Sequence, residues 1–188
     1  MRKIAKGVLY FFLALIILVS AIIIIDIIGW DSATRESARI APNPEEHSDA
    51  VVQVYAAELW GFRGMFADHM WIATKQKNAL AYTVYEVIGW RLSEGYDTSL
   101  RIAEDIPDRK WYGAVPRVLV NETGAQAEML IKEIQAAAMS YPYPKEYSAF
   151  GPNSNTFIAW VLCKVPNLNL TLTRRAVGKN YLNDGCSG

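Results

Sequence analysis

Residues 51–75, VVQVYAAELWGFRGMFADHMWIATK, contain the pattern on which the predicted fold depends. Val51–Trp60 is rich in Val, Tyr and Ala, and we expect it to form a strand. The glycines of Gly61–Gly64 indicate a turn, and Phe66–Lys75 follows as a second strand. Two strands joined by so short a connection predict an antiparallel pair.

A third strand extends this pattern. In Ala81–Leu92 the side chains of Val84, Glu86, Ile88 and Trp90 share one face by the two-residue strand period. The three segments together predict an antiparallel meander. Two further segments are less regular: residues 97–113 are charged and indicate a surface loop or a short helix, and residues 115–120 indicate another short strand.

Two helices are expected in the second half of the chain. Thr123 and Gln126 have the spacing of a capping box at the start of the first helix. Apolar residues then follow at helical spacing: Ala127, Leu130, Ile131, Ile134 and Ala138. That helix must end before Pro142. The second helix is expected to be capped by Asn153 and to end at Pro166. The predicted fold class is α+β, a small antiparallel sheet packed against two helices.

The N-terminus has the pattern of a membrane anchor. Arg2, Lys3 and Lys6 precede an uncharged run of nineteen residues, Gly7–Ile25. A helix needs roughly 20 apolar residues to span a bilayer. The run is longer than a signal-peptide core and ends in isoleucines rather than small residues, which favours an uncleaved anchor. The basic residues predict a cytoplasmic N-terminus.

These observations divide the chain into a membrane anchor at 1–30, a polar tether at 31–49 and an exported α+β domain at 50–188. The expected location is the bacterial inner (plasma) membrane, crossed once, with the domain periplasmic or otherwise extracytoplasmic. Residues 7–30 would make the lipid bilayer a partner. The formal net charge is zero and no basic cluster with interleaved aromatics is present, so no nucleic-acid partner is expected.

The cysteines and histidines are few. An exported location would permit a disulfide between Cys163 and Cys186. Cys163 nevertheless lies in an apolar helical segment, where cysteine commonly serves as a small core residue, and we predict free thiols. His47 and His69 are the only histidines and show no metal-ligand spacing, so neither a metal nor another cofactor is expected.

Ser154 is the candidate nucleophile. It would be the first residue of its helix, where unpaired backbone N–H groups and the helix dipole stabilise an anion. The same place suits an ordinary polar capping residue, and Asn153 and Asn155 beside it could serve as caps or as oxyanion donors. If His69 and Glu86 faced this helix start, Glu86 would orient His69, and His69 would accept the proton of Ser154. Sequence spacing leaves both interpretations open.

Four stretches carry a resemblance to a known family: DHMWIATK, YEVIGWRL, YPYPKEYSAFGPNSNTFIAWVL and RRAVGKNYL. They resemble the bacterial family defined as domain of unknown function 3750. The likeness covers roughly residues 51–182, and GPNSNTF is its most specific element. The family implies no established activity, and its members usually continue in Gly-rich sequence beyond the GKNYL segment.

A second, more distant resemblance implies candidate catalytic residues. The order strand-His, strand-Glu and Asn-headed helix is similar to the circularly permuted papain-like fold of NlpC-type amidases and lecithin–retinol acyltransferase relatives. This likeness places Ser154 at the nucleophile position, His69 at the histidine position and Glu86 at the polar position, with Asn153 and Phe157 matching the flanks. Those relatives use a cysteine thiol as the nucleophile, and the hydroxyl of serine is far less acidic than a thiol.

The resemblance implies a membrane-anchored amide or ester hydrolase, or an acyltransferase, that uses Ser154, His69 and Glu86. The alternative is a non-catalytic binding or accessory module on the same fold. Either one could take an envelope peptide or a lipid as its ligand.

Overall fold

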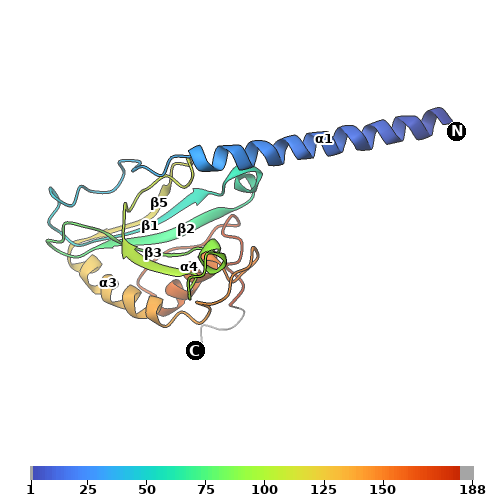
Figure 1. Cartoon of the computed structure of the whole chain (residues 1–188). Coiled ribbons are helices and arrows are strands. Elements are labelled where there is room, and N and C mark those ends of the chain that lie inside the picture. Colours follow the sequence, from blue (N-terminus) through green and yellow to red (C-terminus); the bar gives the residue numbers. More distant parts are fainter. Residues whose placement is uncertain (1, 183–188) are drawn as a thin grey trace. The chain divides into compact units, whose positions relative to one another are not determined.

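The computed structural model describes residues 2–182, apart from the side chains at positions 2–5, 23, 25–28 and 30–32. It separates a first unit that ends at Thr34 from a second unit that begins at Arg35. The first unit consists of the helix α1, Arg2–Ser32 (Figure 1).

The predicted membrane span is not supported by the described residues. Among them, no helix reaches the length and apolar character that crossing a bilayer requires.

The second unit is built on a five-stranded sheet in the order β4-β3-β2-β1-β5. Its strands are β1 Val51–Glu58, β2 Asp68–Lys75, β3 Thr83–Val87, β4 Leu100–Glu104 and β5 Arg117–Thr123. Each neighbouring pair is antiparallel. The predicted meander and the α+β class are therefore confirmed.

Two local predictions need correction. The expected third strand ends at Val87, and the short helix α2, Trp90–Ser93, follows it. The segment expected to be a loop or short helix contains β4. Its alternating sequence, LRIAE, is short and edge-placed, so its strand character was hidden among the surrounding charges.

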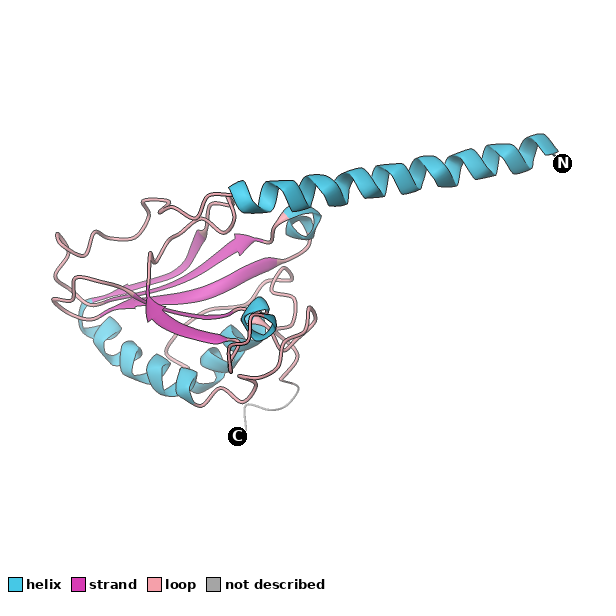
Figure 2. Cartoon of the chain, viewed as in Figure 1, coloured by secondary structure: helices cyan, strands magenta, loops and turns pink. Residues whose placement is uncertain are grey.

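Two longer helices, α3 Gly124–Met139 and α4 Ser154–Lys164, cover one face of the sheet (Figure 2). The inward side chains of the strands form one apolar core with them, and Met70 and Ile72 are the β2 members of this core. The predicted capping box of α3 is wrong, because the Thr123 side chain makes no capping hydrogen bond. Thr123 is also the last residue of β5, with an extended backbone.

Loops cover the opposite face, and the predicted tether contributes to them. Asp108 holds the segment after Arg35: its Oδ1 accepts from Ser37 Oγ at 2.8 Å, and its Oδ2 accepts from the N–H groups of Ile40 at 2.5 Å and Ala41 at 3.0 Å. Much of the expected tether at 31–49 is therefore folded onto the domain.

The prediction of free thiols is wrong for Cys163, which is disulfide-bonded. Cys163 lies in the last turn of α4, where its side chain is only partly buried rather than enclosed in the core. Cys186 lies outside the described residues.

Candidate functional site

The start of α4 is closed by a complete capping box. Asn153 Oδ1 accepts hydrogen bonds from the backbone N–H groups of Asn155 at 3.0 Å and Thr156 at 3.1 Å. The Asn153 N–H donates in return to Thr156 Oγ1 at 3.2 Å. The prediction that Asn153 caps this helix, with Ser154 in its first turn, is confirmed.

The two asparagines also tie the helix start to other segments. Asn153 Nδ2 donates to the carbonyl oxygens of Ala149 and Val177, both at 3.1 Å. Asn155 Nδ2 donates to the carbonyl oxygens of Asp68 at 3.0 Å and Val177 at 2.9 Å. Because these amide groups already bind backbone carbonyls, the two asparagines act as structural connectors here, and their predicted oxyanion role stays a prediction.

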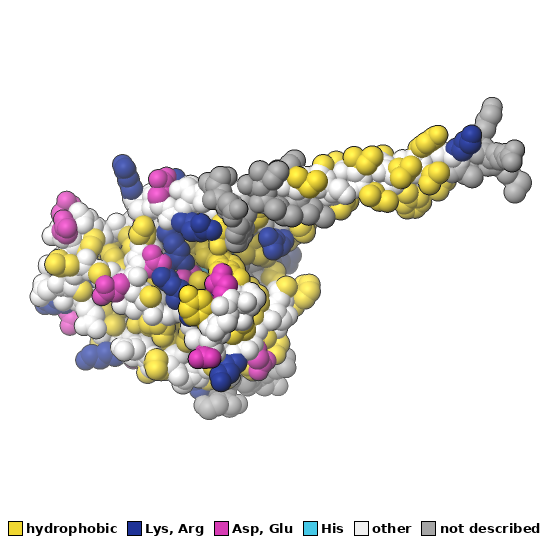
Figure 3. All heavy atoms as spheres, in the orientation of Figure 1, with side chains coloured by type: hydrophobic (Ala, Val, Ile, Leu, Met, Phe, Trp, Pro, Cys, Tyr) yellow, Lys and Arg dark blue, Asp and Glu magenta, His cyan; other side chains and the backbone are white. Residues whose placement is uncertain are grey.

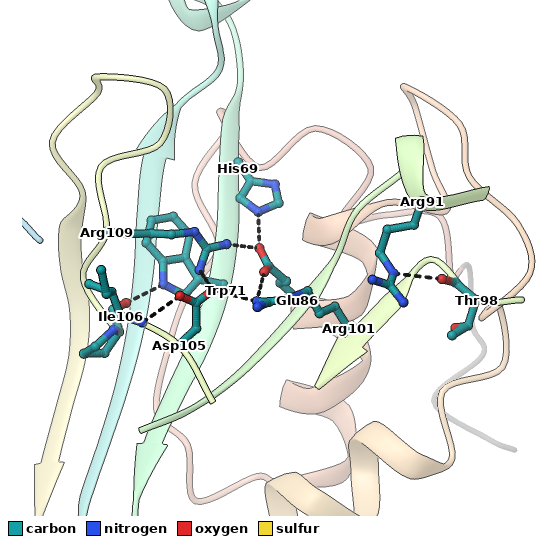
Figure 4. Close-up of polar contacts among 10 residues, drawn as sticks. His69, Trp71, Glu86, Arg91, Thr98, Arg101, Asp105, Ile106 and Arg109 are labelled. Carbon is teal, nitrogen blue, oxygen red and sulfur yellow. Dashed lines mark hydrogen bonds and ion pairs between the residues drawn. The ribbon is translucent and has the colours of Figure 1, made fainter. Parts of the chain in front are cut away.

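His69 and Glu86 meet on the loop-covered face of the sheet (Figure 4). His69 Nε2 lies 3.4 Å from Glu86 Oε2, and the two side chains are almost completely buried. The Trp111 ring is stacked on the imidazole, with ring centroids 3.5 Å apart and planes 10° apart. The His69–Glu86 pair suggested by the sequence therefore exists, beneath an aromatic cover.

Two arginines neutralise Glu86. Arg109 Nη2 donates to Glu86 Oε2 at 2.5 Å, and Arg101 Nη1 donates to Glu86 Oε1 at 2.9 Å (Figure 4). Both arginines also donate to Asp105 Oδ2, at 3.2 Å and 2.8 Å. We call His69, Glu86, Arg101, Asp105 and Arg109 the buried charge cluster. Sequence reasoning missed its arginines, because they lie on a short edge strand and in the loop that follows it, where no regular pattern marks them.

The surroundings of Glu86 and His69 shift the pKa values of both groups. Burial alone would raise the pKa of Glu86, but the His69 hydrogen bond and the Arg109 charge outweigh it and lower the pKa to about 2. Burial lowers the pKa of His69, and this effect is opposed by Glu86. Near neutral pH the pair is therefore a carboxylate against a neutral imidazole, whose Nε2–H faces the carboxylate and whose Nδ1 is the acceptor.

Ser154 does not join this pair. Successive strand residues point to opposite faces, so Met70 and Ile72 meet α4 while His69 and Trp71 point to the loops. No hydrogen bond joins the Ser154 side chain to His69 or Glu86 within residues 2–182. Two residues of the hypothesised relay therefore meet, and Ser154 begins the helix that packs on the other face of the sheet.

The site offers no metal centre among the residues described. Across residues 2–182, the His, Cys, Asp and Glu side chains form no group of three that could hold a metal ion. The buried charge cluster is balanced internally, with two arginines facing two carboxylates.

These features define an α+β domain with a helix-covered sheet face, a loop-covered face and a buried charge cluster under the loops. Residues 49–181 match the family described as "Protein of unknown function (DUF3750)". The match spans more than half of the chain, and the protein belongs to this family. No curated protein and no solved structure matches the chain, so the likeness to the permuted papain-like fold is not confirmed.

Proposed function

We propose that the protein is a single-pass membrane-anchored envelope protein whose extracytoplasmic domain is a binding or accessory module. The observation that carries the anchor is the surface of α1. Its described large apolar residues, from Val8 to Ile24, are 42–69% exposed (Figure 3). An exposed apolar surface of this extent needs an apolar partner, and a bilayer is the partner that suits a helix apolar on all sides.

The proposal takes the whole uncharged run of the sequence, Gly7–Ile25, including positions whose side chains are not described. A run of this length approaches the roughly 20 residues of a spanning helix. Arg2, Lys3 and Lys6 favour a cytoplasmic N-terminus. The disulfide-bonded state of Cys163 supports an oxidising compartment for the domain.

The binding or accessory role rests on the placement of Ser154. A serine nucleophile requires a base within about 2.6–3.2 Å, or somewhat further without substrate. Ser154 instead begins a helix packed on the face opposite to that of His69. The His69–Glu86 pair has a sufficient structural role, because together with the arginines it holds the loop of Asp105 and Arg109 on the sheet.

A hydrolase or acyltransferase is the second candidate. The observation that favours it is the protonation of the pair: a neutral imidazole oriented by an ionised glutamate is the arrangement that a general base requires. A rearrangement that brought the Nδ1 atom of His69 to Ser154 would complete the relay.

A fluorophosphonate probe distinguishes the two candidates. We expect no labelling of the membrane-bound wild-type chain, because no hydrogen bond joins Ser154 to His69 or Glu86 among residues 2–182. Ser154→Ala should retain the stability of the wild type within about 0.5 kcal/mol, because within the described part of the chain its hydroxyl makes no hydrogen bond that would be lost. Mass spectrometry reads the labelling, and Ser148→Ala is the matched control. Labelling that disappears in Ser154→Ala but persists in Ser148→Ala would establish the enzyme instead.

A further inference from the structure

The connection between β1 and β2 carries an exposed apolar cluster. It contains the 3₁₀ helix η1, Gly61–Met65, followed by Phe66. Phe62 is 54% exposed, Met65 67% and Phe66 66%. Figure 2 shows the short helical turn at the end of β1. We call residues 61–66 the η1 loop.

We propose that the η1 loop inserts Phe62, Met65 and Phe66 into the surface of the bilayer that holds α1. The inference rests on the proposed membrane anchor and adds a second contact with the membrane. Aromatic side chains are favoured at the membrane–water interface. The exposed Arg63 between them suits the anionic head groups of that surface.

The backbone of the η1 loop is held by contacts with the rest of the domain. A Cβ atom at Gly64 would lie 2.2 Å from the Leu59 carbonyl oxygen, which leaves room only for glycine. Arg175 donates to the carbonyl oxygens of Gly64 at 2.5 Å and Met65 at 3.0 Å. Arg175 is itself held by Asp68 Oδ1 at 2.9 Å. The domain therefore binds the loop through its backbone and presents its apolar side chains outward.

The η1 loop also lies at the edge of the domain where the chain arrives from α1. Arg35, the first residue of the second unit, lies over the Tyr112 ring at 4.0 Å. Tyr112 in turn packs edge-on against Trp60, with ring centroids 6.4 Å apart. Trp60 directly precedes the loop. Only residues 33 and 34 separate α1 from Arg35, so they can bridge no more than about 10 Å. The proposed contact takes this edge, which the short segment connects to α1, as the one that faces the bilayer.

Fluorescence in nanodiscs tests the inference on the full chain. Phe66→Cys and Phe62→Cys are labelled with NBD in discs of phosphatidylethanolamine and phosphatidylglycerol, without reductant. Lys77→Cys, exposed in the turn after β2, is the matched control, and the unsubstituted chain sets the background. We expect blue-shifted emission at positions 62 and 66, and quenching by doxyl-labelled lipid several-fold stronger than at 77.

The possible outcomes test the membrane contact of the η1 loop separately from the membrane anchor. Water-like emission and control-level quenching at both loop positions, in chains that co-elute with the discs, would overturn the loop contact and leave the anchor intact. Chains that do not enter the discs at all would overturn the anchor, and the loop proposal with it. Emission that becomes blue-shifted only when cell extract is added would also overturn it, because the loop would then bind a protein.

Discussion

Replacing Glu86 by glutamine is expected to destabilise the domain by about 3–5 kcal/mol, because it leaves the buried Arg109 and the partly buried Arg101 without their shared carboxylate. Arg109 and Arg101 both donate to Glu86, whose side chain is fully buried. Urea unfolding of the full chain in mild detergent, followed by tryptophan fluorescence, measures the loss. Glu104→Gln removes an exposed carboxylate from the neighbouring strand and should change the unfolding free energy by less than about 0.5 kcal/mol.

The pH dependence gives a second readout of the same change. Since the folded pKa of Glu86 is lowered from 4.5 to about 2, its contribution is complete above pH 4.5 and is lost as the pH falls toward 2. Stability should therefore fall in this window, and Glu86→Gln should flatten the fall. The role assigned to Glu86 would be contradicted if Glu86→Gln and Glu104→Gln lowered the unfolding free energy equally. It would also be contradicted if the unfolding free energy of Glu86→Gln and of the wild type depended on pH in the same way.

Replacing Trp71 by alanine is expected to cost about 3–5 kcal/mol, because it empties the centre of the loop-covered face. The Trp71 side chain is fully buried. It stacks on Tyr55 with ring centroids 5.4 Å apart, and its Nε1–H donates to the Pro107 carbonyl oxygen at 2.7 Å. The same urea titration measures the effect.

Trp71→Phe is the matched variant. It keeps most of the ring packing and removes the hydrogen bond to Pro107, so a loss nearer 1–2 kcal/mol is expected. If Trp71→Ala lowered the unfolding free energy no more than Trp71→Phe, the loop-covered face would not be a second hydrophobic core of the domain. That result would remove the structural reason for the buried charge cluster beside it.

Local pattern made the central strands and α4 predictable. The Val, Tyr and Ala content identified β1 correctly, and the glycine turn after it marked the approach to β2. The Asn153 cap marked the start of α4 to the residue. The fourth strand was missed because LRIAE is short and its neighbours are charged. Thr123 is the N-cap residue of α3 as predicted, but its side chain makes no capping hydrogen bond, so the predicted capping box does not form. Short edge strands and strand-to-helix junctions are determined by long-range packing, which local pattern does not contain.

The candidate site was predictable only in part. The two-residue period assigned Glu86 to one face of its strand, and a histidine on the adjacent strand was a reasonable partner. The strand register decides which side chains of β2 face α4. A shift of one residue would turn His69 toward α4 and Met70 toward the loops. The arginines of the buried charge cluster lay in a segment without regular pattern, so their convergence on Glu86 required the structure.

The proposal of an anchored protein with its domain outside the cytoplasm is tested by the orientation of the chain in the membrane. Alkaline phosphatase, which needs an oxidising compartment, is fused after Gly188 of the full chain, and a cytoplasm-active fluorescent protein is fused in parallel. We expect an active phosphatase fusion in the membrane fraction that resists alkaline extraction. We also expect Arg2, Lys3 and Lys6 to be required for this orientation. An inactive phosphatase with a bright fluorescent fusion, or a chain released by alkaline extraction, would contradict the proposal.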